Sequence, residues 1–276
     1  MIASKRVPVR KEYLGGIFRF ARAPQAFDPE AVAPWRLGEG KRGVLLVHGF
    51  AGTPPELRRL GEHLAANGFR CYAPALAGHA STTEEMAKTG FRDWVRTARA
   101  GLDELLLSCN SVAVVGQSMG GTIALHLAAT DTRVQAVTTL AAPLWLGGPW
   151  PIVLPWMRFV FPWHSVTPSS ELGSEEAMQS YTWRSNRTVI ELFRLMRLVR
   201  GELGRICAPV LIIHGGADRA INPRNSYDIA RGLRHSQAIK WIIYPRSGHA
   251  LSVGADATRI NQRVLEWLDR HCPATA

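Results

Sequence analysis

Residues 112–121 read Val-Ala-Val-Val-Gly-Gln-Ser-Met-Gly-Gly, an apolar run that leads directly into a serine between glycines. The run predicts a strand buried on both faces, and residues 118–129 have the composition of a helix. A chain that turns from strand to helix within about one residue strains Ser118 and exposes its hydroxyl. Because Gly116 and Gly120 lie close to this turn, neither can carry a bulky side chain. We therefore predict Ser118 as a nucleophile, with the positive end of the following helix facing any oxyanion.

The rest of the chain repeats this alternation of short apolar runs and helical segments. Strands are predicted at 43–48, 69–73, 111–116, 133–140, 209–214 and 238–244, and helices at 54–67, 91–107, 118–129, 222–233 and 255–270. The alternation favours an α/β fold in which helices cover both sides of a mostly parallel sheet. Reactive residues in such sheets lie beyond the carboxyl ends of the strands. Any partner of Ser118 should therefore follow a strand directly.

The pattern around Ser118 resembles the nucleophile elbow of the α/β-hydrolase superfamily. The resemblance implies that nucleophile, acid and base follow one another along the chain as Ser, then Asp or Glu, then His. Residues 214–223, His-Gly-Gly-Ala-Asp-Arg-Ala-Ile-Asn-Pro, are similar to the acid loop of this family, and residues 244–249 are similar to its histidine loop. The resemblance thus implies a catalytic triad of Ser118, Asp218 and His249. Asp218 would orient the imidazole, and His249 would be the base.

The expectation that reactive residues follow strands selects the same two partners for Ser118. Asp218 and His249 each come directly after a predicted strand. The other candidates fit less well, because Asp228 falls inside a predicted helix, His235 precedes a strand and His271 lies at the end of the last helix.

The resemblance also implies an oxyanion hole, in which two N–H groups stabilise the negative oxygen of the tetrahedral intermediate. One donor would be the N–H of Met119, and the second that of Phe50 in a loop similar to the HGF loop of the family. We expect His48 to brace this loop by hydrogen bonding rather than to act as a second base. A further loop resembles the GHG loop of the family, with Ala80 in the last place. We expect His79 to be structural there and Ala80 to alter the loop at the pocket rim.

Residues 143–206 interrupt the strand rhythm at the place where this superfamily carries its cap. We predict a small, mainly helical cap. The predicted division of the chain is an N-terminal arm at 1–40, a hydrolase core at 41–142 and 207–276, and the cap at 143–206.

The apolar side chains of the cap allow two interpretations. Within 186–200 they recur at helical spacing, so this stripe either packs onto the core or walls an acyl-chain pocket. We favour the acyl-chain pocket, because a triad at the open edge of the sheet needs side chains that wall the substrate site. The predicted substrate-binding residues are Trp145, Trp150, Phe193 and Met196. A basic rim that makes weak contact with a membrane surface is a further hypothesis.

Composition excludes several classes of protein. The chain has 276 residues, of which 46% are apolar, so it is not intrinsically disordered. Its formal net charge is +11, but the basic residues are scattered and no run of them exceeds two. We therefore interpret the charge as surface composition and predict no nucleic-acid partner.

The spacing of the cysteines and the composition of the N-terminus indicate the cellular compartment of the protein. The cysteines at 71, 109, 207 and 272 form neither a CxxC pair nor a zinc pattern, which predicts free thiols in a reducing compartment. The basic N-terminus lacks the apolar segment of a secretory signal. Residues 143–163 are apolar but contain five prolines, which argues against a membrane-spanning helix. We predict a soluble, cytoplasmic protein.

From about Val44 to Cys272 the chain resembles bacterial carboxylesterases and monoacylglycerol lipases. The resemblance implies a serine hydrolase that cleaves a small ester or acylglycerol through an acyl-enzyme, as a monomer or dimer and without a metal or organic cofactor. Thioesterases, carbon–carbon bond hydrolases, peptidases and perhydrolases share this triad and stay open. A non-catalytic ligand-binding protein on the same scaffold is the alternative from another class.

Overall fold

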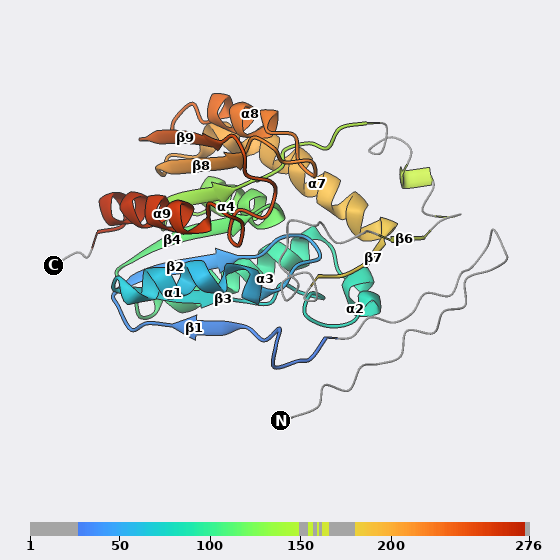
Figure 1. The fold of residues 1–276 in the computed structure, drawn as a ribbon, viewed down its shortest axis with the longest axis horizontal. Coiled ribbons are helices and arrows are strands. Elements are labelled where there is room, and N and C mark those ends of the chain that lie inside the picture. The colour runs from blue at the N-terminus through green and yellow to red at the C-terminus, as the bar shows by residue number, and fades with distance from the viewer. Residues whose placement is uncertain (1–26, 149–153, 157–158, 160–161, 166–179, 274–276) are drawn as a thin grey trace.

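The computed structural model is built around a seven-stranded sheet with the strand order β1-β3-β2-β4-β5-β8-β9 (Figure 1). Strand β1 is antiparallel to β3, and all other neighbouring pairs are parallel. The strands are β1 (Trp35–Leu37), β2 (Arg42–Val47), β3 (Phe69–Ala73), β4 (Ser111–Gln117), β5 (Val134–Leu140), β8 (Val210–Gly215) and β9 (Ile239–Tyr244). The structure describes residues 27–148, 154–156, 159, 162–165 and 180–273.

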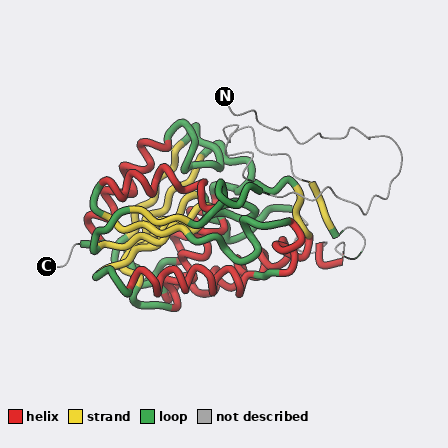
Figure 2. The backbone as a smooth tube through the Cα atoms, turned by 90° about the horizontal axis from the view of Figure 1, so that it is seen from below, coloured by secondary structure: helices red, strands yellow, loops and turns green. Residues whose placement is uncertain are grey.

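Helices lie on both sides of this sheet (Figure 2). The α-helices are α1 (Arg58–Ala66), α2 (Thr83–Lys88), α3 (Phe91–Leu106), α4 (Met119–Thr130), α7 (Asn186–Glu202), α8 (Arg224–Gly232) and α9 (Ala257–His271). Two short 3-10 helices, η1 (Pro54–Leu57) and η2 (Leu203–Arg205), precede α1 and follow α7.

Two apolar clusters, one on each face, attach the helices to the sheet. Val44 and Leu46 of β2 pack in the cluster that contains the apolar residues of α1 and α9. Leu45 and Val47 pack in the other cluster, with residues of α3, α4, α7 and α8. Since successive side chains of a strand point to opposite faces, a continuous apolar run is needed where both faces are covered. This explains why β2 and β4 read as unbroken apolar segments.

The predicted α/β class with a mostly parallel sheet is confirmed, and the six predicted strands match β2, β3, β4, β5, β8 and β9 within two residues at each end. The structure also contains β1, a short strand inside the segment predicted as the N-terminal arm, and the six-residue helix α2. Both are too short for periodicity to reveal them. The four cysteines are free, as predicted.

The described part of the segment predicted as the cap, 143–206, is mainly helical and also contains two short strands. Besides α7, it contains an antiparallel pair of three-residue strands, β6 (Trp163–Ser165) and β7 (Trp183–Ser185). Ser185 caps α7 by accepting a hydrogen bond from the N–H of Arg187 at 3.3 Å. Helix α7 also packs against α4, and its buried Leu195 and Val199 belong to a core cluster. Among the described residues, no helix has the length and apolar content needed to cross a bilayer.

Candidate active site

Ser118 occupies the turn between β4 and α4 in a conformation that L-residues rarely adopt, with φ at 52° and ψ at −121°. The two flanking glycines make this turn possible. A Cβ on Gly116 would lie 2.1 Å from backbone atoms of Gly120, and one on Gly120 would lie 1.9 Å from the carbonyl oxygen of Val47. Neither position can therefore hold a side chain. The strain at Ser118 is offset by backbone bonds, including one from its N–H to the oxygen of Leu140 at 2.7 Å.

Asp218 and His249 form a hydrogen-bonded pair. Nδ1 of His249, in the loop after β9, lies 2.8 Å from Oδ2 of Asp218, in the loop after β8. The other oxygen, Oδ1, accepts hydrogen bonds from the N–H groups of Ala220 and Ile221 at 2.9 and 2.8 Å. Burial alone would raise the pKa of Asp218, but hydrogen bonds from His214 and His249 outweigh it and lower that pKa. The carboxylate is therefore ionised, so Nδ1 of His249 donates to it and Nε2 is the ring nitrogen that can accept a proton.

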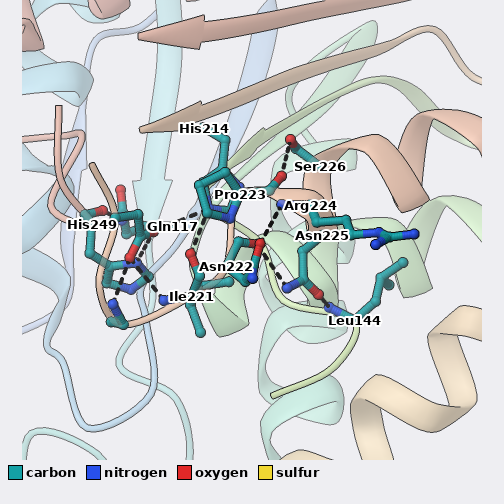
Figure 3. Close-up of polar contacts among 12 residues, drawn as sticks. Gln117, Leu144, His214, Ile221, Asn222, Pro223, Arg224, Asn225, Ser226 and His249 are labelled. Carbon is teal, nitrogen blue, oxygen red and sulfur yellow. Dashed lines mark hydrogen bonds and ion pairs between the residues drawn. The ribbon is translucent and has the colours of Figure 1, made fainter. Parts of the chain in front are cut away.

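Two residues that sequence reasoning did not assign hold this pair in place. Nε2 of the buried His214 lies 3.1 Å from Oδ2 of Asp218 and 3.2 Å from the carbonyl oxygen of Ile221 (Figure 3). The side-chain amide of Gln117 donates to the carbonyl oxygen of His249 at 2.8 Å. Since Gln117 directly precedes Ser118, this bond connects the loop of His249 to the turn that carries Ser118.

Ser118 and His249 line one cavity with a volume of about 350 Å³. Apolar and polar side chains share its wall. Its lining also includes Phe50, Glu56, Gln117, Leu146, Tyr181, Arg184, Leu192, Arg219, Ile221 and Val253.

The loop after β2 reaches this cavity, where Phe50 is part of the wall. His48 braces the loop, because its Nε2 accepts the N–H of Leu76 at 3.0 Å while Nδ1 lies 2.9 Å from the carbonyl oxygen of Gly49. Burial lowers the pKa of His48 to about 4, so the ring is neutral and suited to this pattern. Met119 is the first residue of α4, and the first N–H groups of a helix have no partner within it.

Glu56, in η1, is another functional candidate that the sequence did not reveal. Its Oε1 accepts a hydrogen bond from the N–H of Gly49, and its side chain is part of the cavity wall. Burial raises the pKa of Glu56 to about 7, although the bond from Gly49 acts in the opposite direction. The sequence does place a glutamate in the first helical turn after the HGF loop. This was not a specific signal, because acidic residues are common in the first turn of any helix.

The predicted substrate-binding side chains are not brought together at the cavity. Trp145 donates from Nε1 to Asp228 at 2.8 Å and packs beside the core cluster that also contains Met196 and contacts Phe193. None of these three is among the residues of the cavity wall, whereas Leu192 of α7 is. Trp150 lies outside the described residues.

The start of the cap is fixed to the core by Asn225 of α8. Its Oδ1 accepts the N–H group of Leu144 at 2.7 Å (Figure 3). The same oxygen accepts the N–H group of Trp145 at 2.9 Å. This anchor, together with the bond to Asp228, turns Trp145 toward α8.

His79 has the surroundings of a structural residue. Its ring lies 5.1 Å from that of His48 and 5.7 Å from that of Trp94, measured between centroids. Burial lowers the pKa of His79 to about 3, so the ring is neutral. The next residue, Ala80, has φ at 55°, in the left-handed region that favours glycine.

The chain is similar to a known family and to several known proteins. Residues 38–255 match the family described as "Serine aminopeptidase, S33". The chain is 31% identical over 242 residues to a thermostable monoacylglycerol lipase of Bacillus sp. (strain H-257), covering 86% of this chain and 94% of that protein. It is 26% identical over 239 residues to a carboxylesterase of Bacillus subtilis (strain 168), covering 86% and 96%. A solved chain from work on two metagenome-derived lipolytic enzymes, LipS and LipT, superimposes with a TM-score of 0.83 at 25% identity, covering 90% and 100%.

Proposed function

The chain belongs to the serine aminopeptidase S33 family of α/β-hydrolases, and from this premise we propose that it is a carboxylesterase or monoacylglycerol lipase that uses Ser118, Asp218 and His249. The observation that carries the proposal is the strained Ser118 in one cavity with His249, whose Nδ1 lies 2.8 Å from Asp218. The names of the two Bacillus relatives support carboxylic esters, among them monoacylglycerols, as the substrate class.

The proposed reaction follows from these contacts. Ser118 attacks the ester carbonyl while Nε2 of His249 takes its proton, and Asp218 stabilises the imidazolium that forms. The N–H groups of Phe50 and Met119 bind the oxyanion of the tetrahedral intermediate, beside the positive end of α4. His249 returns the proton to the leaving alcohol, which leaves an acyl group on Ser118. A water activated by His249 then releases the acid and restores the serine.

The charge of the cavity favours an esterase over an aminopeptidase within this family. An aminopeptidase has to bind the positively charged amino terminus of a peptide. The described part of the wall contains two basic side chains, Arg184 and Arg219, and one acidic side chain, Glu56. Burial raises the pKa of Glu56 to about 7, so this group is half protonated near neutral pH. Such a wall repels a cation rather than binding it.

Replacing the nucleophile tests the proposal. Ser118→Ala should lower kcat on p-nitrophenyl butyrate by about 10⁴-fold or more, because the covalent step is lost. Wild type should be labelled by a fluorophosphonate and the variant should not. Circular dichroism and thermal unfolding should match wild type, since the change is one oxygen atom. Substantial ester turnover by the folded variant would contradict the triad, and an unreactive wild type would favour the non-catalytic alternative.

Contact with a membrane surface is a separate hypothesis. It is supported by the exposed Trp156 and Phe159 of the cap, which are 77% and 73% accessible. Co-sedimentation with anionic vesicles at low and high salt is the test. A protein that stays in the supernatant at both salt concentrations would refute it.

A further inference from the structure

Arg184 of strand β7 contributes a cationic side chain to the wall of the cavity that contains Ser118. Its guanidinium carbon lies 5.6 Å from the ring centroid of Phe50. Burial lowers the pKa of Arg184 to about 10, which still leaves the group charged at neutral pH. Its Nε is shielded from solvent and has no hydrogen-bond partner among the described residues.

The described surroundings of Arg184 do not balance this charge. Glu56 is the one carboxylate in the described wall, and Gly49 donates to it while burial raises its pKa to about 7. Asp218 is already bonded to His214 and His249. A second arginine, Arg219, lies on the same wall. The described wall therefore carries more positive than negative charge near neutral pH, and no described carboxylate forms an ion pair with Arg184.

A purely structural role explains only part of this arrangement. Stacking on Phe50 would use the flat face of the guanidinium and help to hold the cap strand against the oxyanion loop. It would not satisfy the shielded N–H of Nε, and a buried polar group without a hydrogen bond is costly. An anion bound in the cavity would satisfy this donor, because a guanidinium can bind carboxylate or phosphate oxygens through paired N–H groups.

We propose that Arg184 is a specificity residue that binds an anionic group of the ester, so that the enzyme prefers esters carrying a carboxylate or phosphate to neutral esters of equal length. The inference rests on the proposed esterase function and extends it to the class of substrate. Because Arg184 lies beside the ring of Phe50 and lines the same cavity as Ser118, the anion would bind in the cavity that holds the ester.

Two matched pairs of esters test the preference and locate the anion. p-Nitrophenyl hemiadipate against p-nitrophenyl hexanoate places the charge on the acyl group. 1-Butyrylglycerol 3-phosphate against 1-butyrylglycerol places it on the alcohol. Wild type should have a kcat/KM about 10- to 100-fold higher for the anionic member of at least one pair, as expected for a charge-assisted hydrogen bond. Equal values in both pairs would overturn the inference without any variant.

Substitutions then assign the preference to Arg184. Arg184→Met keeps an unbranched, though shorter, side chain and removes the charge, so the ratio of kcat/KM between anionic and neutral esters should fall about 10- to 100-fold. Arg184→Lys should restore part of the ratio, because lysine keeps the charge but not the fork of donors. Arg187→Gln, at an exposed position on α7, removes the same charge outside the cavity wall and should keep the wild-type ratio. A ratio that Arg184→Met leaves unchanged would overturn the assignment.

The same experiment distinguishes failure of this inference from failure of the proposed function. Hydrolysis of the neutral esters by wild type, and its loss in Ser118→Ala, reports on the esterase alone. Ser118→Ala also supplies the background rate for the hemiadipate. If neutral esters are cleaved and no anion preference exists, the esterase stands and the role of Arg184 is wrong.

Discussion

Glu56 is an acid held in an environment that disfavours its charge. Its carboxyl group accepts from the N–H of Gly49 and lies beside the loop that carries Phe50. Since burial raises its pKa to about 7, folding favours the protonated form. The interaction with Gly49 therefore connects the protonation of one side chain to the position of the predicted oxyanion hole.

Glu56→Gln should make stability less dependent on pH. For an acid whose pKa is higher in the folded state, the stabilising contribution is complete below the unfolded value of 4.5 and is lost as pH rises through about 7. The unfolding free energy of wild type should thus fall, relative to that of the variant, by up to about 3 kcal/mol between pH 5 and pH 8. Urea unfolding of both proteins at four pH values measures this difference.

The comparison isolates Glu56 because the neighbouring titratable groups are the same in both proteins. His48, with its pKa lowered to about 4, stays neutral above pH 5, and Arg184 stays charged up to pH 8. His249 is present in both proteins, so it does not cause a difference between their curves of stability against pH. Parallel curves of stability against pH would show that Glu56 is ionised in the folded protein.

At the scale of elements, the turn that ends at Ala80 carries a conformational cost. Ala80 has φ at 55°, and a residue with a side chain is disfavoured there by roughly 1–2 kcal/mol. Glycine is not disfavoured at this φ, although it loses more entropy on folding. Ala80→Gly should therefore raise the unfolding free energy by about 0.5–1 kcal/mol, as measured by urea denaturation.

A matched control is the same substitution within a regular helix. Ala100 is exposed in the middle of α3, where glycine should lower stability by about 0.5–1 kcal/mol. Opposite signs for the two substitutions would support strain at Ala80. If Ala80→Gly is as destabilising as Ala100→Gly, the methyl group of Ala80 contributes packing that exceeds any strain.

The elements also show which features the sequence could predict. The core strands and the loops of Asp218 and His249 were predictable because apolar runs and strand ends are local signals. The helix α7 was predictable for the same reason, but its orientation was not. A stripe of helical spacing does not say which of its residues reaches the cavity. In the structure Leu192 and Met196 both pack in the core cluster, and of the two only Leu192 also lines the cavity.

The remaining parts of the site depend on contacts between distant segments. Gly49 meets Glu56 across a turn, Gln117 reaches His249 across the sheet edge, and Arg184 arrives from a cap strand of only three residues. Such a short strand has no periodicity, and the burial of a charged side chain cannot be inferred from the identity of the residue alone. These are therefore the residues that the sequence left unassigned.

For the whole molecule, the proposed esterase takes its catalytic residues from the core and part of its cavity wall from the segment predicted as the cap. The sheet edge supplies Ser118, Asp218 and His249 from separate loops, whereas the cap supplies Leu192 and Arg184 to the cavity wall. Helix α7 is part of a core cluster through Leu195 and Val199, so its position is set by the fold rather than by the substrate. Changes to the cavity-facing side of the cap should therefore alter which ester is accepted while the chemistry persists.

Leu192→Phe tests this division, because it adds volume to the wall of a cavity of about 350 Å³. The longest p-nitrophenyl ester that wild type cleaves efficiently should lose about tenfold or more in kcat/KM, since each methylene that no longer fits forfeits its binding energy. The acetate ester, which does not reach the filled region, should lose much less. Met196→Leu, one turn further along α7 and inside the core cluster, should leave the chain-length profile as in wild type. If Met196→Leu shifts the profile and Leu192→Phe does not, the acyl chain lies along the stripe predicted from the sequence and not in the cavity beside Leu192.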